Sequence, residues 1–159
     1  MKMQYTLVDL LKLETIQTGL AATDARDAIG KLADSLVAAQ DVTAEFAADV
    51  WKREETFPTG LPTQPLAVAI PHADPDHVLR SAVAVGVLES PVQFAQMGTD
   101  GSTVLEVNIL FLLAIKEKEK QVEMIQQLVR LIQSANLLIR LSAAGDPAEA
   151  LSMIREALS

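Results

Sequence analysis

The chain has 159 residues, a length that fits one domain, and its core must be aliphatic because half of the residues are hydrophobic but only 4% are aromatic. The formal net charge of −8 argues against nucleic-acid binding, and the absence of cysteine excludes disulfides and a thiolate mechanism on this chain. The longest clean apolar run, 109–115, is far shorter than the ~20 residues that span a bilayer, and residues 1–5 lack the apolar core of a signal peptide, so we expect a cytoplasmic protein without membrane insertion.

The first elements that the pattern predicts are a weak strand and two helices. Partial alternation indicates a strand over 10–16, which Gly19 ends. Apolar residues then recur at helical spacing and predict a helix over 24–39, with Thr23 or Asp24 as a candidate cap. A second helix is expected over 43–55, before the next proline.

Residues 53–72 form the segment around which the rest of the chain is organised. The segment holds four of the chain's seven prolines, each of which fixes its own φ angle and restricts the residue before it: Pro58, Pro62, Pro65 and Pro71. This composition predicts a stiffened loop that delivers a short strand over 67–70 and leaves His72 at the end of that strand. A side chain in that place is held by the scaffold and stays open to a partner, which favours chemistry.

The residues after His72 predict a short helical segment. Asp74 and Pro75 are a reasonable cap and first helical residue, and one or two turns are expected to run through Arg80. The free amides of such a turn would favour an anion near His72, although Asp74 and Asp76 would work against it.

The second half of the chain predicts further strands and helices around one sheet. A strand over 82–88 is apolar on both faces, 91–94 begins a short edge strand or loop, and 104–115 is the strongest strand. Helical faces follow at 122–132, 137–141 and 150–158. We therefore expect an α/β (α+β) fold, a three-layer α/β/α sandwich with a mixed central sheet, in which residues 1–159 form a single domain.

His72 is the first candidate for chemistry. A lone histidine is more often structural than catalytic, but three features favour a functional role here. The chain has two histidines and no cysteine, so few nucleophiles compete. His72 follows a strand and a proline, and Arg53 lies at a helix end from which the loop can bring a guanidinium beside the imidazole.

The run Ala69-Ile70-Pro71-His72-Ala73, with Arg53-Glu54 upstream, resembles the active-site motif of a known family. This family comprises the enzyme IIA domains of the fructose–mannitol class in the bacterial phosphoenolpyruvate-dependent sugar phosphotransferase system. The wider runs 56–61 and 114–117 are most similar to the galactitol-type member, and the resemblance covers about residues 7–158.

The resemblance implies a phosphohistidine carrier. The phosphorylated carrier protein HPr would donate the group to His72, and a cysteine of the matching enzyme IIB would accept it for the membrane component IIC. No metal or organic cofactor is implied. Neutral imidazole suits this role because its ordinary pKa is about 6.5 and it is a good nucleophile near neutral pH.

Arg53 is the expected donor to the phosphoryl oxygens, as a permanently charged planar fork. Alternatively, Arg53 is a helix-end arginine that bonds carbonyl groups or pairs with Glu54 or Glu55. Hydrogen bonds from Thr59 and Thr63 to the phosphoryl group are also considered.

Gln121 marks a difference from several relatives, which have a second histidine at the start of the helix after the long strand. Glutamine can hydrogen-bond an imidazole or a phosphoryl oxygen but cannot titrate, so we expect a neutral partner of His72. Alternatively, Gln121 is only a polar residue of the first helical turn.

Two further functions remain open from the sequence. One is a regulatory module in which the phosphorylation state of His72 controls a protein partner. The other is a metal hydrolase, since His72 and His77 lie close to Asp74 and Asp76, but this spacing does not match common zinc patterns. His77 is expected to be an exposed helix residue. The sugar is expected to be galactitol-like, a sugar or a sugar alcohol.

Overall fold

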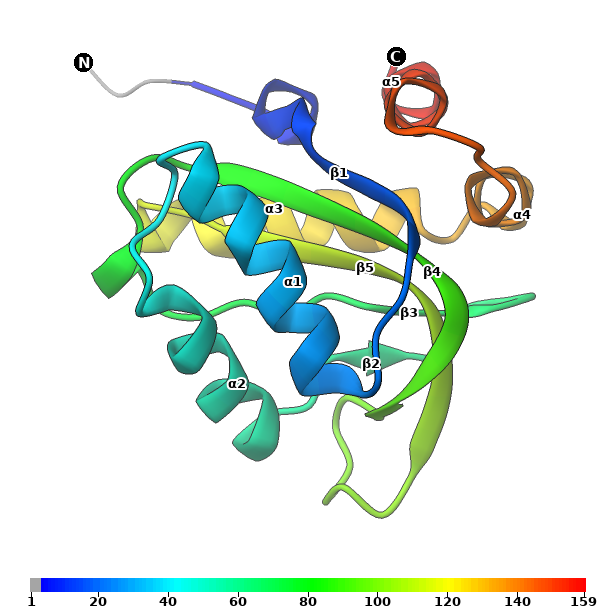
Figure 1. Cartoon of the computed structure of the whole chain (residues 1–159), viewed down its shortest axis with the longest axis horizontal. Coiled ribbons are helices and arrows are strands. Elements are labelled where there is room, and N and C mark those ends of the chain that lie inside the picture. Colours follow the sequence, from blue (N-terminus) through cyan, green and yellow to red (C-terminus); the bar gives the residue numbers. More distant parts are fainter. Residues whose placement is uncertain (1–3) are drawn as a thin grey trace.

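A five-stranded mixed sheet forms the centre of the molecule in the computed structural model, which describes residues 4–159 (Figure 1). Its strands are β1 (Leu11–Leu20), β2 (Gly60–Leu61), β3 (Ala67–Ala69), β4 (Ala82–Ala95) and β5 (Val104–Ala114). The spatial order is β1-β4-β5-β3-β2. The β1–β4 and β3–β5 pairs are parallel, whereas β4–β5 and β2–β3 are antiparallel, so the sheet is mixed as expected.

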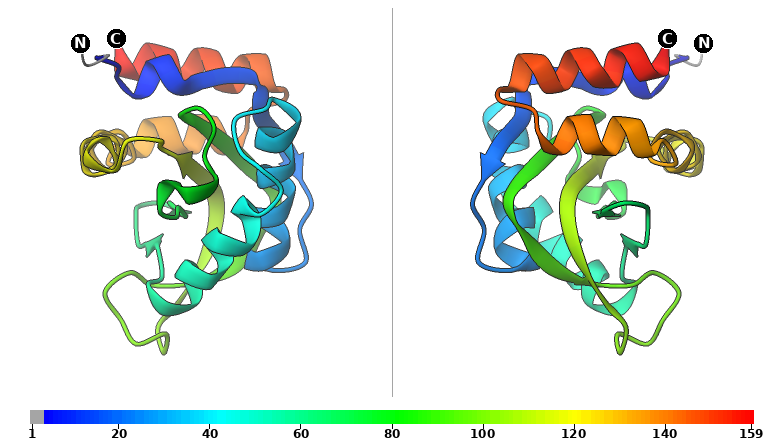
Figure 2. Two further views of the ribbon diagram at one scale, coloured as in Figure 1. Left: turned by 90° about the vertical axis from the view of Figure 1, so that its left-hand side faces the viewer. Right: turned by 90° about the vertical axis from the view of Figure 1, so that its right-hand side faces the viewer.

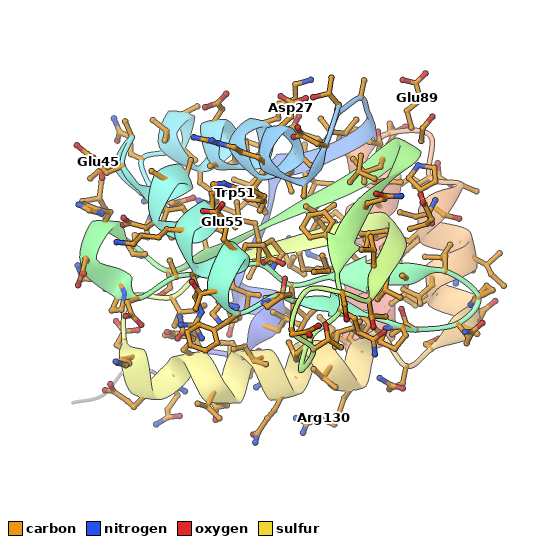
Figure 3. All side chains as sticks on the ribbon, turned by 90° about the horizontal axis from the view of Figure 1, so that it is seen from below. Asp27, Glu45, Trp51, Glu55, Glu89 and Arg130 are labelled. Carbon is orange, nitrogen blue, oxygen red and sulfur yellow. The ribbon has the colours of Figure 1, made fainter. Side chains whose placement is uncertain are left out.

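Helices cover both faces of this sheet. They are α1 (Ala25–Ala38), α2 (Phe46–Thr56), α3 (Lys118–Leu131), α4 (Ala135–Ser142) and α5 (Pro147–Leu158), with short 3₁₀ segments η1 (Leu7–Leu10) and η2 (Pro75–His77). One apolar cluster joins the sheet to α1 and α2, and another joins it to α3, α4 and α5. Figure 3 shows α1 and α2 on one side of the sheet and α3 on the other, with Arg130 pointing away from the sheet. The three-layer α/β/α prediction is confirmed.

The central strands explain why both faces are covered. On β4, Val83 and Val85 belong to the cluster on the α3–α5 side, while Ala82 and Ala84 belong to the cluster on the α1–α2 side. Alternate residues of a strand point to opposite faces, so an apolar residue at every position requires a helical layer on each side. At Gly86 an added Cβ would lie 3.0 Å from a methyl group of α1, so this glycine permits the close approach of that helix.

Helix starts follow the capping residues in the sequence. The Asp24 side chain accepts a hydrogen bond from the Asp27 backbone N–H at the start of α1. The Asp146 side chain does the same for Glu149 in α5, and Pro147 occupies the first turn. Each cap satisfies an N–H group that has no partner inside the helix, and the start that the sequence predicts for α1 is confirmed.

Four sequence-based boundaries were wrong. The second helix was expected from 43 but begins at Phe46. The first strand continues to Leu20, because Gly19 adopts a φ of 59° within β1 and does not end it. Residues 91–94 do not form a separate element but continue β4 past an irregularity in its pairing with β5. The helix after His72 is only the single turn η2, since the backbone N–H groups of 79 and 80 both bond to the carbonyl oxygen of Asp41.

The first and last elements lie side by side. Figure 2 shows η1 and β1 running beside α5, which packs against both. In the part of the chain that the structure describes, no helix combines the length and the apolar character that crossing a membrane requires.

Candidate functional site

His72 is held in place by backbone pairing along β5. Beyond the end of β3 the chain continues beside this strand, and the Leu113 N–H donates to the Pro71 carbonyl oxygen at 3.0 Å. His72 itself forms a parallel bridge with Leu113, and the Ile70 N–H bonds to the Thr59 carbonyl oxygen at 3.3 Å. The proline-rich segment therefore places this histidine as an extension of the sheet.

The His72 ring has one nitrogen occupied and one available. Its Nδ1 lies 2.9 Å from the Ile70 carbonyl oxygen, and a carbonyl only accepts, so Nδ1 carries the proton and Nε2 keeps its lone pair. The residue is only 6% exposed, which is more buried than the sequence suggested. Burial lowers the pKa of His72, and the nearby Arg53 charge lowers it further, while the bond to Ile70 opposes the shift. The ring is therefore neutral at pH 7 and suited to nucleophilic attack through Nε2.

Arg53 lies in the last turn of α2, and its guanidinium has a hydrogen-bond donor without a partner. Its Nε is buried and has no hydrogen-bond partner, and none of the ion pairs within residues 4–159 involves this side chain. The guanidinium carbon lies 5.2 Å from the centre of the Phe57 ring. The structure thus shows neither the Glu54 nor the Glu55 ion pair that was considered as an alternative.

A cavity of about 350 Å³ opens beside this arginine, and Ala73, the residue after His72, is part of its lining. It is lined by Asp49, Lys52, Arg53, Thr56, Phe57, Ala73, Asp74 and Asp76. His72 is not part of the lining, so a group on Nε2 would lie at the edge of this space.

Thr59 and Thr63 do not point their donors at the site. The Thr59 backbone N–H and hydroxyl both donate to the Glu54 carboxylate at 2.8 Å, and the Thr63 hydroxyl donates to the Leu66 carbonyl oxygen at 2.7 Å. Burial raises the pKa of Glu54, although the two bonds from Thr59 oppose the shift. These residues hold the loop between α2 and β3 and leave the phosphoryl site to other donors.

Gln121 contacts the backbone next to His72 and not the ring. It lies in the first turns of α3, is 8% exposed, and its Nε2 donates to the Ala73 carbonyl oxygen at 2.8 Å. Lys118 and Asp74 form a looser ion pair at 3.9 Å. The start of α3 is therefore tied to the two residues that follow the histidine.

His77 ends η2 and is paired with Asp49 of α2 through its Nδ1. Its side chain is 37% exposed, so it lies partly at the surface, but the ring is held by its bond with Asp49. The hydrogen bond with Asp49 raises the pKa of His77. Within residues 4–159 no group of three or more histidine, cysteine or acidic side chains is arranged to hold a metal ion.

Another cavity, of about 520 Å³, lies between η1 and the start of α3. Several of its polar groups are already engaged: the Tyr5 hydroxyl donates to Glu117 at 2.6 Å, and Arg80 is paired with Asp41 at 2.7 Å. Arg53, Ala73 and the other residues next to the histidine do not line it, so we assign the site to the smaller cavity.

Sequence reasoning missed Asp49 and Phe57. Asp49 precedes Arg53 by one helical turn, and this spacing was a usable signal that the two share a face. Phe57 follows the helix as an exposed aromatic residue. It lies in the run 56–61 that carries the family resemblance, but no role was predicted for it.

Comparison with known proteins shows which family this chain and its fold resemble. The profile of the family described as "Phosphoenolpyruvate-dependent sugar phosphotransferase system, EIIA 2" matches residues 9–157. A multiphosphoryl transfer protein of Escherichia coli O157:H7 is 29% identical over 94% of the chain, which spans only 17% of that relative. The galactitol-specific EIIA component of Escherichia coli K12 is 22% identical over 77% of the chain and 80% of that protein.

Solved structures agree with the fold. The complex of enzyme IIA(Mtl) with phosphorylated enzyme IIB(Mtl) from Escherichia coli matches with a TM-score of 0.74 and 23% identity, over 92% of this chain and 97% of the matched one. The profile defines the class of protein, an EIIA component of a sugar phosphotransferase system, and the solved structure agrees with its fold. The chain belongs to the EIIA 2 family of the phosphoenolpyruvate-dependent system, which contains the enzyme IIA domains of the fructose–mannitol class.

Proposed function

We propose that this chain is the phosphocarrier subunit IIA of a sugar uptake system. It accepts a phosphoryl group from phosphorylated HPr on His72 and passes the group to a cysteine of its cognate enzyme IIB. The observation that carries this proposal is the fixed tautomer of the ring: Nδ1 donates to Ile70, which leaves the Nε2 lone pair for the phosphorus atom.

The transfer needs no cofactor. The Nε2 lone pair attacks the phosphorus, a nitrogen–phosphorus bond forms, and the bond to the donor group of HPr breaks with its electron pair staying on the donor. The proton on Nδ1 stays in its hydrogen bond to Ile70 throughout. A thiolate of enzyme IIB then attacks the phosphorus, the nitrogen–phosphorus bond breaks, and the electron pair returns to Nε2.

Arg53 meets the charge that develops on the phosphoryl oxygens. Its Nε is buried without a partner, and Arg53 is among the residues that line the cavity beside His72. A donor that is already fixed and desolvated stabilises the transferring group without reorganisation at the moment of reaction. The burial of His72 also keeps water away from the bond between nitrogen and phosphorus.

The partners and the sugar form part of this proposal. The IIA–IIB complex among the matching folds supports enzyme IIB as the acceptor, and the galactitol-specific relative supports a galactitol-like sugar or sugar alcohol. HPr serves as the donor, component IIC takes part indirectly, and the reaction takes place in the cytoplasm. Residues 1–159 form a single EIIA type-2 domain, of which the family profile matches 9–157.

Phosphorylation in a defined mixture tests the proposal. The chain is incubated with phosphoenolpyruvate, enzyme I and HPr, and the product is examined by mass spectrometry and ³¹P NMR. We expect one acid-labile phosphoryl group on Nε2 of His72, no uptake by His72→Ala, and one group on His77→Ala at the end point. A labelled His72→Ala protein would overturn the assignment.

Addition of the cognate enzyme IIB then separates transport from the regulatory alternative. In the phosphocarrier function the group moves to the cysteine of IIB, and IIB with its cysteine replaced by serine leaves it on His72. If the phosphorylated chain keeps its group in the presence of IIB, the phosphocarrier function is refuted and the regulatory one is favoured.

A further inference from the structure

Asp49 and Arg53 are placed to form an ion pair that the structure does not contain. They lie four residues apart on α2 with the acid first, the order that favours pairing along a helix, and both line the cavity beside His72. Arg53 nevertheless takes part in no ion pair within residues 4–159. The Asp49 carboxylate is instead bound by His77.

The backbone presents His77 to α2 in a fixed position. The Thr43 N–H, just before that helix, donates to the His77 carbonyl oxygen at 3.0 Å, and Val42 forms a bridge with Val78. The Val78 N–H also closes η2 by bonding to the Pro75 carbonyl oxygen at 3.0 Å. The imidazole is therefore held against Asp49 by the scaffold on both sides.

We propose that His77 is a positioning residue, which holds the Asp49 carboxylate away from Arg53 and so keeps the guanidinium free for the phosphoryl group. This inference rests on the proposed function, because it concerns the same transfer to His72. In the absence of His77, Asp49 would turn to the guanidinium one helical turn away and compete with the phosphoryl oxygens for its donors.

The surroundings of His77 make this hold depend on pH. Three carboxylates face it: Asp49 from the middle of α2, Glu45 from the start of that helix, and Asp76 from η2. Figure 3 shows Glu45 at the end of the molecule where η2 lies. The bond with Asp49 is the main reason that the pKa of His77 is raised, so the charged form persists above pH 6.5. As the pH rises through the raised pKa, the hold on Asp49 weakens and transfer should slow.

A double-mutant comparison of the initial phosphorylation rate tests the inference. His77→Ala should be slower roughly two- to fivefold, the size expected when an ion pair along a partly exposed helix face competes for one donor. The double variant His77→Ala with Asp49→Asn should be as fast as Asp49→Asn alone, because the competing charge is gone in both. Asp49→Asn alone should lose the slowing at alkaline pH. Each rate is taken relative to wild type with the same HPr, so titration of the donor cancels.

Glu45→Gln is the matched control. It removes a carboxylate that also faces His77 but lies two turns from Arg53 and cannot pair with the guanidinium, so at pH 6, where His77 stays charged through its bond with Asp49, the rate should stay at the wild-type value. A His77→Ala protein at the wild-type rate, or a double variant as slow as His77→Ala, would overturn the inference and show that His77 only supports the loop.

NMR of the Arg53 Nε–Hε group gives a second readout that needs no phosphoryl transfer. This signal should move in His77→Ala and return to its wild-type position in the double variant. A signal that stays unchanged in His77→Ala contradicts the inference. A wild-type protein that accepts no phosphoryl group from HPr would instead refute the proposed function, whatever this signal shows.

Discussion

Replacing Gln121 gives the sharpest test of how α3 supports the site. Its Nε2 donates to the Ala73 carbonyl oxygen at 2.8 Å, and the two residues are 8% and 3% exposed. Gln121→Ala leaves that carbonyl buried without this donor, for which we expect a loss of about 1–2 kcal/mol in the free energy of unfolding. The same loosening next to His72 should slow phosphoryl transfer by roughly 2- to 10-fold, which corresponds to about 0.5–1.5 kcal/mol.

Gln121→His distinguishes the hydrogen bond from the chemistry. An imidazole N–H can donate to the same carbonyl, so stability and rate should stay near wild type. The site would then contain two coupled ionisations, visible in the pH profile of the rate. Gln126→Ala is the control, since Gln126 is exposed on the same helix and glutamine and alanine differ little in helix propensity.

The assays are urea unfolding, the initial rate with phosphorylated HPr, and an NMR titration of the His72 ring. If Gln121→Ala unfolds like Gln126→Ala and moves neither the rate nor the pKa of His72, the reasoning fails. Gln121 would then be a helix residue whose bond to Ala73 has no consequence for the histidine.

Three further predictions concern His72 and two residues in the last turns of α2, Arg53 and Glu54. Arg53→Ala should slow phosphoryl transfer about 10- to 100-fold, since a charge-assisted contact contributes roughly 1.5–3 kcal/mol, while the melting temperature stays nearly constant. A large drop in melting temperature with a normal transfer rate would show that the arginine has a structural role. The NMR titration midpoint of His72 should lie below 6.5, because burial lowers its pKa; a midpoint above 6.5 contradicts this. The stability that the neutral form of His72 contributes should be complete above pH 6.5 and decline as the pH falls toward the folded pKa. Glu54→Ala should lower the unfolding free energy by about 2–4 kcal/mol, because it leaves both buried donors of Thr59 without an acceptor. Glu54→Gln keeps one acceptor and should lose less. Equal losses for the two variants, measured by urea unfolding, would refute a stabilising role of the two bonds between Thr59 and Glu54.

The sequence was most informative where the signal was local. The apolar run over 82–88 and the candidate cap Asp24 predicted elements that the structure contains, since each depends on neighbours within a few residues. The prolines and the isolated His72 likewise marked the segment that positions the ring.

What the sequence could not reveal depends on contacts between distant segments. The short η2 results from the Asp41 carbonyl, which takes the amides that a longer helix would have used. The Asp49–His77 pair joins positions 28 apart, and no spacing rule links a helix residue to a later loop. Gln121 was placed near His72 only through the family resemblance, and its partner proved to be the Ala73 backbone.

The order of strands in the sheet also bears on how the chain folds. β4 and β5 are neighbours in sequence and pair antiparallel, so they can form a hairpin early. β3 precedes both strands in the sequence but pairs in parallel with β5, so β4 separates the two partners along the chain. This pairing is non-local and is therefore a slower step. The bridge between His72 and Leu113 can close only after that step. We therefore expect a refolding chain to regain most of its helical circular-dichroism signal before it regains the capacity to be phosphorylated.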